Sequence, residues 1–197
     1  KKLVVTGSCW EYGRNQGKLD ESLNLIPNNP FTVAKSSILE MGKQISEKYG
    51  FIFIWARLFY VYGPGQSEHS LLPSLINMAK NGKKPEAKSP FAKNDFIYVK
   101  DVINVINWFL NKPKINGLFN VGSSIPQSFN YLAKCVYRNC NISEKIEYID
   151  TPKKIRKQYQ YFTKASLNKL RKVGYNKKFF NLKDGINDYI QNYLIKL

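Results

Sequence analysis

The 197-residue sequence has few of the residues and segments on which several protein classes depend. It has one histidine, His69, and three cysteines, Cys9, Cys135 and Cys140, none of them in a CxxC pair. These counts argue against a zinc site with cysteine and histidine ligands, and against a disulfide framework. No apolar run reaches the roughly 18 residues of a membrane span, and the opening KKLVVT is too short for a signal peptide. We expect a soluble cytoplasmic protein without a metal site.

The charge is strongly unbalanced, with 31 Lys and Arg against 14 Asp and Glu, a formal net charge of +17. Most of the excess is lysine scattered through a chain that is also rich in Asn, Ile, Tyr and Phe. This pattern favours a solvated lysine surface over a nucleic-acid interface, and an anionic small-molecule substrate fits it equally well. The apolar fraction of 43% excludes a disordered chain.

Apolar strand-like runs alternate with segments of helical spacing, which predicts an α/β protein built on a parallel sheet. No GxGxxG occurs, and the predicted strands are too few for a complete dinucleotide-binding sheet, so we expect the rear part of a larger fold. Predicted strands are residues 2–6, 51–55, 96–99, 118–121 and 146–149. Predicted helices are residues 31–49, 71–80, 101–110 (with Asp101 as N-cap), 127–138, 164–172 and 182–194.

Five segments carry a family resemblance: TGSCWEYG (6–13), PNNPFTVAK (27–35), ARLFYVYGPGQ (56–66), NDFIYVKDV (94–102) and GLFNVGSS (117–124). In this order and at these separations they resemble the NAD(P)-dependent epimerase/dehydratase family of extended short-chain dehydrogenase/reductases, whose members act on nucleotide sugars. The tail, from residue 146 to 190, resembles the heptose 6-epimerase branch of that family. The resemblance covers nearly the whole chain but only the rear two thirds of such an enzyme.

The resemblance implies a partial Rossmann-like parallel sheet with flanking helices, plus a small C-terminal α/β substrate domain. Residues 1–66 and 95–125 would form the rear of the dinucleotide-binding domain. Residues 67–94 and 126–197 would form the substrate domain. Because the glycine-rich front is absent from the sequence, we expect the 197-residue chain alone to bind dinucleotides negligibly.

By the same resemblance, the activity would be transient hydride transfer from a sugar to NAD or NADP. The substrate would be a nucleotide-diphosphate sugar, in surface polysaccharide or lipopolysaccharide precursor synthesis. A homo-oligomer is a further expectation that the sequence leaves open, and no nucleic-acid or membrane partner is expected.

Ser8 and Lys35 match the family's catalytic serine and lysine, but Phe31 stands where the family has its tyrosine base. A tyrosine serves as base because a lysine one helical turn along lowers its pKa, whereas a phenyl ring has no proton to exchange. Either another group supplies the base or the family's oxidation step does not occur. The candidate substitutes are Tyr12, Tyr60 and His69, the last close to where the heptose epimerases have a second catalytic lysine.

Further departures lie at the positions that the family uses to bind substrate. Asn94 and Gln158 stand where arginines would grip the diphosphate, and Tyr60 replaces an asparagine, so the substrate differs from the usual one or binds weakly. On the resemblance, the cofactor would contact Lys35, Tyr60, Gly63 and Pro64. The substrate would contact Ser8, Tyr60, Asn94, Gln158 and Tyr159.

Other polar and apolar residues of these segments are interpreted as structural. Arg57 would pack and bond around a strand end, Asp95 and Asp101 would cap or bond locally, and Cys9 would be a small buried residue. The departures keep an alternative open: a catalytically degenerate or truncated family member that binds a sugar nucleotide or acts as a scaffold. A third, weaker hypothesis is an anion- or nucleic-acid-binding module driven by the net charge.

Overall fold

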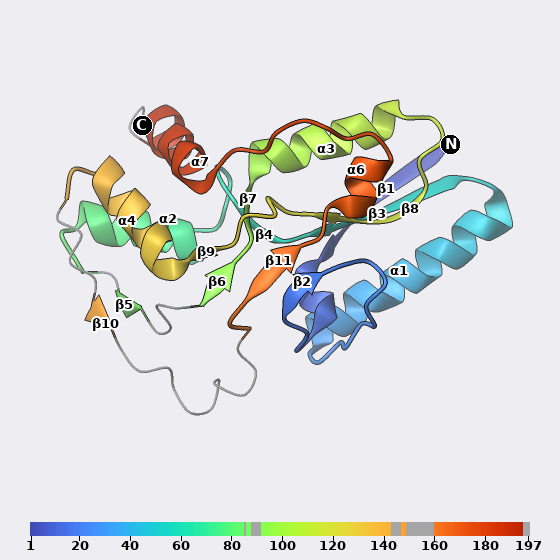
Figure 1. The fold of residues 1–197 in the computed structure, drawn as a ribbon, viewed down its shortest axis with the longest axis horizontal. Helices are drawn as coiled ribbons and strands as arrows, with labels where there is room; N and C mark the ends of the chain where they lie inside the picture. The colour runs from blue at the N-terminus through green and yellow to red at the C-terminus, as the bar shows by residue number, and fades with distance from the viewer. Residues whose placement is uncertain (85, 88–91, 143–146, 149–159, 195–197) are drawn as a thin grey trace.

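The computed structural model has a three-stranded parallel sheet with helices on both faces (Figure 1). The strand order is β1-β3-β8, which confirms the predicted parallel, Rossmann-like sheet. The sheet and its two main covering helices are β1 (Lys2–Ser8), β3 (Ile52–Leu58), β8 (Gly117–Val121), α1 (Pro30–Tyr49) and α3 (Val99–Asn111). The structure describes residues 1–84, 86–87, 92–142, 147–148 and 160–194.

The central strand β3 is buried on both faces, which explains its continuous apolar sequence. Alternate side chains point to opposite faces of a strand. Phe53 and Trp55 pack with Leu39 of α1, whereas Ile54 and Ala56 belong to the core that α3 completes. The sheet is therefore the middle layer of an α/β/α arrangement.

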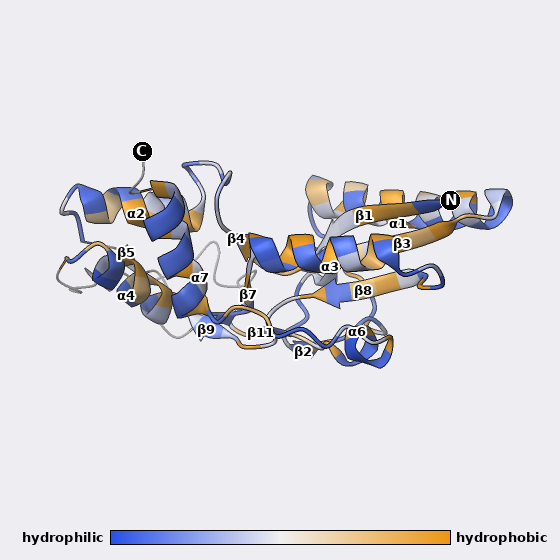
Figure 2. Cartoon of the chain, turned by 90° about the horizontal axis from the view of Figure 1, so that it is seen from above, coloured by the Kyte–Doolittle hydropathy of each residue, from blue (hydrophilic) through white to orange (hydrophobic). Residues whose placement is uncertain are grey.

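A separate group of helices lies beside the sheet, as Figure 2 shows. Its core includes Leu72, Ile76, Leu132, Val136 and Ile186. These side chains come from three helices that pack on one another, the last of which continues as one π-helical stretch. The helices are α2 (Leu71–Lys80), α4 (Phe129–Asn139), α7 (Leu182–Tyr189) and η2 (Ile190–Leu194).

Short strand pairs join distant parts of the chain between and around these two cores. The parallel pairs are β4 (Tyr60–Tyr62) with β7 (Phe96–Tyr98), β11 (Thr163–Ala165) with β2 (Gly17–Leu19), and β10 (Glu147–Tyr148) with β5 (Glu86–Ala87). An antiparallel pair joins β6 (Lys93–Asn94) to β9 (Gln127–Ser128). The other elements within the described residues are η1 (Cys9–Tyr12) and α6 (Asn168–Lys172).

Two predictions about the elements are wrong. The helix predicted from residue 164 begins at Asn168, because residues 163–165 pair with β2 instead. Asp101 is not an N-cap: α3 begins at Val99, and the Asp101 carboxylate accepts a hydrogen bond from the Phe180 amide (2.8 Å). Of the predicted strand at residues 146–149, only Glu147–Tyr148 are described, and they form β10.

The division into two domains stays a prediction. Residues of β11 and α6, which were assigned to the substrate domain, contribute Ala165 and Leu170 to the core beneath the sheet. No helix among the described residues is both long and apolar enough to span a bilayer.

Candidate functional site

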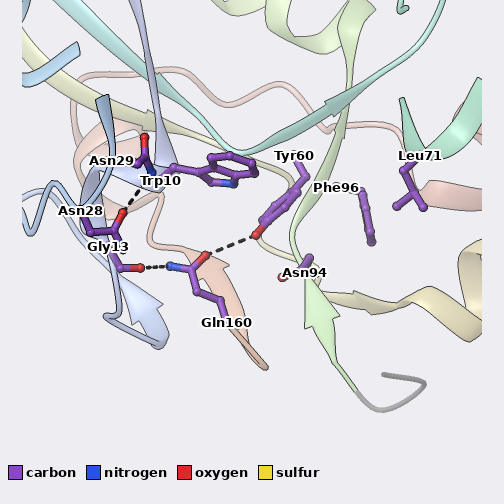
Figure 3. Close-up of a pocket in the computed structure, with 9 residues that line it drawn as sticks. All are labelled: Trp10, Gly13, Asn28, Asn29, Tyr60, Leu71, Asn94, Phe96 and Gln160. Atoms are coloured by element: carbon purple, nitrogen blue, oxygen red, sulfur yellow. Dashed lines mark hydrogen bonds between the residues drawn. The ribbon is translucent and has the colours of Figure 1, made fainter. Parts of the chain in front are cut away.

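A pocket of about 340 Å³ opens next to the carboxyl ends of β1 and β3, facing the separate group of helices (Figure 3). Ligands of open α/β sheets bind outside the carboxyl ends of the strands, so the position alone makes this the candidate site. Its walls come from η1, β4, the start of α2, β6 and β7, and from the segments before β2, α1 and β11. The lining residues are Trp10, Gly13, Asn28, Asn29, Tyr60, Leu71, Asn94, Phe96 and Gln160.

Gln160 joins two walls of this pocket, as the dashed lines in Figure 3 show. Its amide nitrogen donates to the carbonyl oxygens of Gly13 (2.7 Å) and Asn15 (3.2 Å). Its amide oxygen accepts from the Tyr60 hydroxyl at 3.3 Å. Because the two backbone carbonyls can only accept, they fix which end of the amide faces Tyr60.

Trp10 forms a second wall of the pocket. It places the pocket next to two residues of α1 that lie at the family's catalytic positions, Phe31 and Lys35. Its indole is half-exposed and makes an edge-to-face contact with Phe31, with ring centroids 6.3 Å apart. The Phe31 ring is also half-exposed, and the Lys35 ammonium lies 5.9 Å from its centroid. Lys35 donates to the carbonyl oxygen of Thr6 at 2.8 Å, which holds its side chain at the carboxyl end of β1.

Ser8 lies in this same region, at the end of β1, where it caps η1. Its hydroxyl accepts from the Trp10 amide (3.2 Å), and its own amide donates to the Glu11 carboxylate (2.6 Å). The reciprocal bonds form a capping box, which fixes the backbone at the turn. Glu11 is fully buried and also accepts from the Trp55 indole and the Arg57 guanidinium. The Glu11 carboxylate therefore holds the backbone of Ser8, and the Ser8 hydroxyl in turn holds the Trp10 amide.

Glu11 and Arg57 form a buried ion pair, with Arg57 Nη2 2.9 Å and Nε 3.0 Å from Glu11 Oε2. Both nitrogens donate to this one oxygen, and such charge-assisted bonds offset part of the cost of burying both charges. Arg57 also lies over the Tyr12 ring, 4.5 Å from its centroid. The interpretation of Arg57 as a structural residue at the strand end is confirmed.

Tyr12, one of the candidate substitutes for the base, is completely buried. Its hydroxyl lies 2.8 Å from the Asp20 carbonyl oxygen and 2.9 Å from Asn120 Oδ1, so neighbouring residues occupy it. Burial raises the pKa of Tyr12 above its usual value of 10. A buried phenol with a raised pKa stays protonated at neutral pH and so cannot accept the proton, and its burial keeps a sugar from reaching it.

The other predicted residues lie at varying distances from the pocket. Tyr60 and Asn94 line it, and Thr163 donates to the Asn94 amide oxygen at 3.1 Å. His69 lies in the turn before α2, with 91% of its side chain exposed. Gln158 and Tyr159 lie outside the described residues.

Gly63 and Pro64 form the turn after β4. At position 63 a side chain would not fit. Gly63 has a φ of 141°, and a Cβ there would lie 2.5 Å from Val99 Cγ1. The close approach of this turn to the start of α3 therefore requires glycine.

Asp95 differs from its expected local role, because its partners are far along the chain. Its buried carboxylate accepts from the Ser123 amide and hydroxyl (2.7 and 2.6 Å), the Ser124 amide (2.9 Å) and the Ala165 amide (2.8 Å). Burial is the largest cause of its pKa being raised above 3.8. It joins the end of β8 to β11 next to Asn94. Cys9 is buried as expected.

Of the lining residues, the sequence analysis named Tyr60 and Asn94 as site residues and missed seven: Trp10, Gly13, Asn28, Asn29, Leu71, Phe96 and Gln160. Trp10, Asn28 and Asn29 lie inside segments 6–13 and 27–35. These motifs therefore indicated that the three residues lie near the site, but not that their side chains face the pocket. Gln160 lies inside the tail segment 146–190, whose resemblance could not show the contacts that Gln160 makes with residues near the other end of the chain.

The model of the NAD dependent epimerase/dehydratase family matches residues 1–122. The chain belongs to this family. It is 32% identical over 216 residues to the ADP-L-glycero-D-manno-heptose-6-epimerase of Fusobacterium nucleatum subsp. nucleatum, an alignment that covers 98% of this chain and 64% of the relative.

A second curated relative supports the family, and a solved structure shows the same fold. The ADP-L-glycero-D-manno-heptose-6-epimerase of Nitratidesulfovibrio vulgaris (strain DP4) is 36% identical over 150 residues, covering 70% of this chain and 46% of the relative. A solved UDP-N-acetylglucosamine 4-epimerase from Methanobrevibacter ruminantium M1, in complex with UDP-N-acetylmuramic acid, superposes with a TM-score of 0.89 at 24% identity, over 100% of this chain and 64% of that one. The chain thus spans between about half and two thirds of the length of the relatives it matches.

The family implies a nicotinamide cofactor, and the residues present fit one end of it. An ammonium has three donors, of which Lys35 gives one to Thr6, so it also suits hydroxyls of a ribose at the end of β1. The sequence contains no glycine-rich loop of the kind that binds a dinucleotide's pyrophosphate. Within this chain, the fit is therefore to the nicotinamide-ribose end.

Proposed function

We propose that this chain is the substrate-binding and lysine-bearing part of a nucleotide-sugar epimerase/dehydratase that uses NAD or NADP. The observation that carries the proposal is the placement of the pocket. It lies at the carboxyl end of the parallel strands, and one wall, Trp10, is in contact with the residue at the family's base position. The proposed setting is the cytoplasmic synthesis of surface polysaccharide or lipopolysaccharide precursors.

Each residue has a separate part in the proposed chemistry. A bound nicotinamide would supply the acceptor for a hydride that leaves a sugar carbon. Lys35 would donate to the ribose of the cofactor, and Ser8, which caps η1, would orient the sugar hydroxyl. The hydroxyl proton must leave at the same time, and Phe31 has no atom that can accept it. Tyr60, whose hydroxyl donates to a neutral amide, is the pocket residue that could replace it.

A second function is favoured by Phe31 itself: binding of a nucleotide sugar without its oxidation. The ring occupies the base position, supports the pocket wall through Trp10 and lies beside the Lys35 ammonium. These contacts need no hydroxyl. A binding protein or scaffold would keep them and lose only the proton transfer.

Substitution of Phe31 by Tyr separates the two functions. The full-length protein is supplied with NAD or NADP and a panel of ADP-, UDP-, dTDP- and GDP-sugars, and products are followed by NMR. If the oxidation step is missing only its base, Phe31→Tyr should raise turnover about 100-fold or more, as general bases typically do. Phe31→Leu is the control, since it changes the side chain without adding a hydroxyl.

The outcomes are distinct. Turnover by the unchanged protein, with no gain in Phe31→Tyr, would show that another residue is the base and would overturn the binding-only function. Sugar binding without turnover in either protein would support the binding function. Failure of the full-length protein to bind any sugar nucleotide would overturn both.

A further inference from the structure

A second cavity, of about 300 Å³, lies between α4 and the start of α7, and we call it the helical cavity. Its lining residues are Tyr131, Lys134, Cys135, Arg138, Asn139 and Lys183. The candidate site shares none of these residues. In Figure 1, α4 and α7 belong to the separate group of helices, away from β1 and α1, which carry Ser8 and Lys35. The helical cavity is therefore a separate place for a ligand.

Five of the six side chains that line the helical cavity lie on one face of α4. They stand at positions 131, 134, 135, 138 and 139, and residues three, four, seven and eight positions apart share one face of a helix. Lys183 comes from the first turn of α7, which packs on α4. Two packed helices thus fix the backbone of every lining residue, so the cavity is part of the helical core and not a gap between loops.

Half of the side chains that line the helical cavity are cations, namely Lys134, Arg138 and Lys183. In the whole chain 31 of 197 residues are Lys or Arg, so six residues taken at random would include about one cation. The cavity is therefore richer in positive charge than the chain around it. Its cations come from both helices and face the cavity from two sides. This arrangement indicates a ligand that carries negative charge.

A carboxylate, that of Asp184, lies near this cluster. The pKa of Tyr131 is raised above 10 by its neighbour Cys135 and by burial, and Asp184 raises it further while Arg138 lowers it. The Asp184 carboxylate accepts from the side-chain amide of Asn181 (2.6 Å), so it is held at the start of α7. The three lining cations outnumber this carboxylate. An anion in the helical cavity therefore meets more positive than negative charge among the described residues.

We propose that the helical cavity binds the phosphate group of a small phosphorylated molecule. A phosphate monoester carries nearly two negative charges at neutral pH, so it suits several cations better than a carboxylate does. The planar guanidinium of Arg138 can donate to two phosphate oxygens at once, and Lys134 and Lys183 act as point charges. The inference does not rest on the proposed function, since it uses no residue of the candidate site.

The size and the other walls of the helical cavity limit what the phosphate can carry. A volume of about 300 Å³ is at the lower end for small-molecule sites, which suits a phosphate with one sugar-sized group. The Tyr131 ring is 39% exposed and offers an apolar face to that group. The Asn139 amide nitrogen donates to the Cys135 carbonyl oxygen (2.8 Å), which orients the amide so that its oxygen can accept from a hydroxyl. A sugar phosphate combines these properties.

The test titrates the full-length protein with glucose 6-phosphate and with inorganic phosphate, followed by phosphorus NMR. Arg138→Gln combined with Lys183→Gln removes two lining cations at exposed positions, and the affinity for both probes should fall about tenfold or more. The matched control, Lys177→Gln combined with Lys178→Gln, removes the same number of charges at exposed positions outside both cavities. It should leave the affinity unchanged, because only the cavity cations contact the phosphate.

A single variant keeps the test independent of how well the double variant folds. Lys183→Glu reverses one charge of the helical cavity at an exposed position and should weaken the binding of glucose 6-phosphate as well. Circular dichroism shows which variants keep the fold. A lipid headgroup would offer the same phosphate chemistry, so co-sedimentation with phosphatidylcholine vesicles that contain phosphatidic acid is run on the same proteins.

The outcomes separate the possible sources of the phosphate. A loss of affinity for the free probes in the cavity variants, with none in the control, supports the inference. No binding of either probe by the unchanged protein, or equal affinities in the two double variants, overturns it and leaves the proposed function standing. Vesicle binding that only the cavity variants lose, without binding of the free probes, overturns the small-molecule ligand in favour of a lipid headgroup.

Discussion

Two polar regions adjoin at the carboxyl end of β1, and they use charge in opposite ways. In the buried region, the Glu11 carboxylate and the Arg57 guanidinium are paired at 2.9 Å and almost fully covered. In the pocket, one residue away along the chain at Trp10, the described walls are uncharged. The charged pair holds the backbone of Ser8, and the neutral walls are left for a ligand. The difference indicates that the charged groups of this region pair with each other inside the protein, while the described lining of the pocket is neutral.

The largest expected effect comes from breaking the buried pair. Arg57→Ala leaves the Glu11 carboxylate buried without its cation, so the free energy of unfolding should fall by about 3–5 kcal/mol. Urea denaturation measures this loss. The matched control is Lys43→Ala, which removes one partner of the exposed Glu40–Lys43 pair and should cost about 0.5 kcal/mol or less.

A double variant tests the physical reason. If the cost arises from an unpaired buried charge, Glu11→Gln combined with Arg57→Ala should be more stable than Arg57→Ala alone. A loss below about 1 kcal/mol in Arg57→Ala, or no recovery in the double variant, would contradict the view that this pair builds the scaffold.

The sheet could be predicted from sequence because its signals are local. The continuous apolar run that became β3 and the periodic segment that became α1 each carry their pattern within about 20 residues. The short strand pairs had no such signal. Thr163–Ala165 forms a strand because it meets Gly17–Leu19 from the opposite part of the chain. The same long-range pairing displaced the predicted helix start.

The position of the candidate site along the chain could be predicted, but the burial and the long-range contacts of its residues could not. The motif segments located Ser8, Phe31 and Lys35 around the end of β1, where the structure has them. Nothing in the spacing could show that Tyr12 is buried, or that Gln160 reaches back to Gly13. Both facts follow from tertiary packing, which a single sequence pattern does not encode.

A buried carboxylate that has no paired guanidinium among the described residues, Asp101, gives an expected effect of intermediate size and can be compared with the paired Glu11. Asp101 is 2% exposed, and burial raises its pKa from 3.8 to about 6. Because the folded state then binds a proton more tightly than the unfolded state, stability should fall as pH rises from about 4 to about 6. Asp101→Asn can still accept from the Phe180 amide and should be more stable at pH 7 by about 1–2 kcal/mol.

Denaturation curves across this pH range check the sign. The unchanged protein should lose stability between pH 4 and 6 relative to Asp101→Asn, whereas the exposed Glu47→Gln should follow the unchanged protein. Parallel curves for Asp101→Asn and the unchanged protein would show that burial of this carboxylate has no cost.

The smallest expected effect concerns the neutral region, where Phe31 supports the pocket wall. Phe31→Leu removes the edge-to-face contact with Trp10, which is worth about 0.5–1 kcal/mol in such pairs. Affinity for a neutral sugar nucleotide should therefore fall about two- to fivefold by calorimetry, while the free energy of unfolding changes little because the ring is half-exposed. Tyr49→Leu, at the exposed far end of the same helix, is the control and should change neither. Equal affinities in Phe31→Leu and the unchanged protein would mean that Trp10 holds its orientation without this ring, and that residue 31 bears on the site only through its missing hydroxyl.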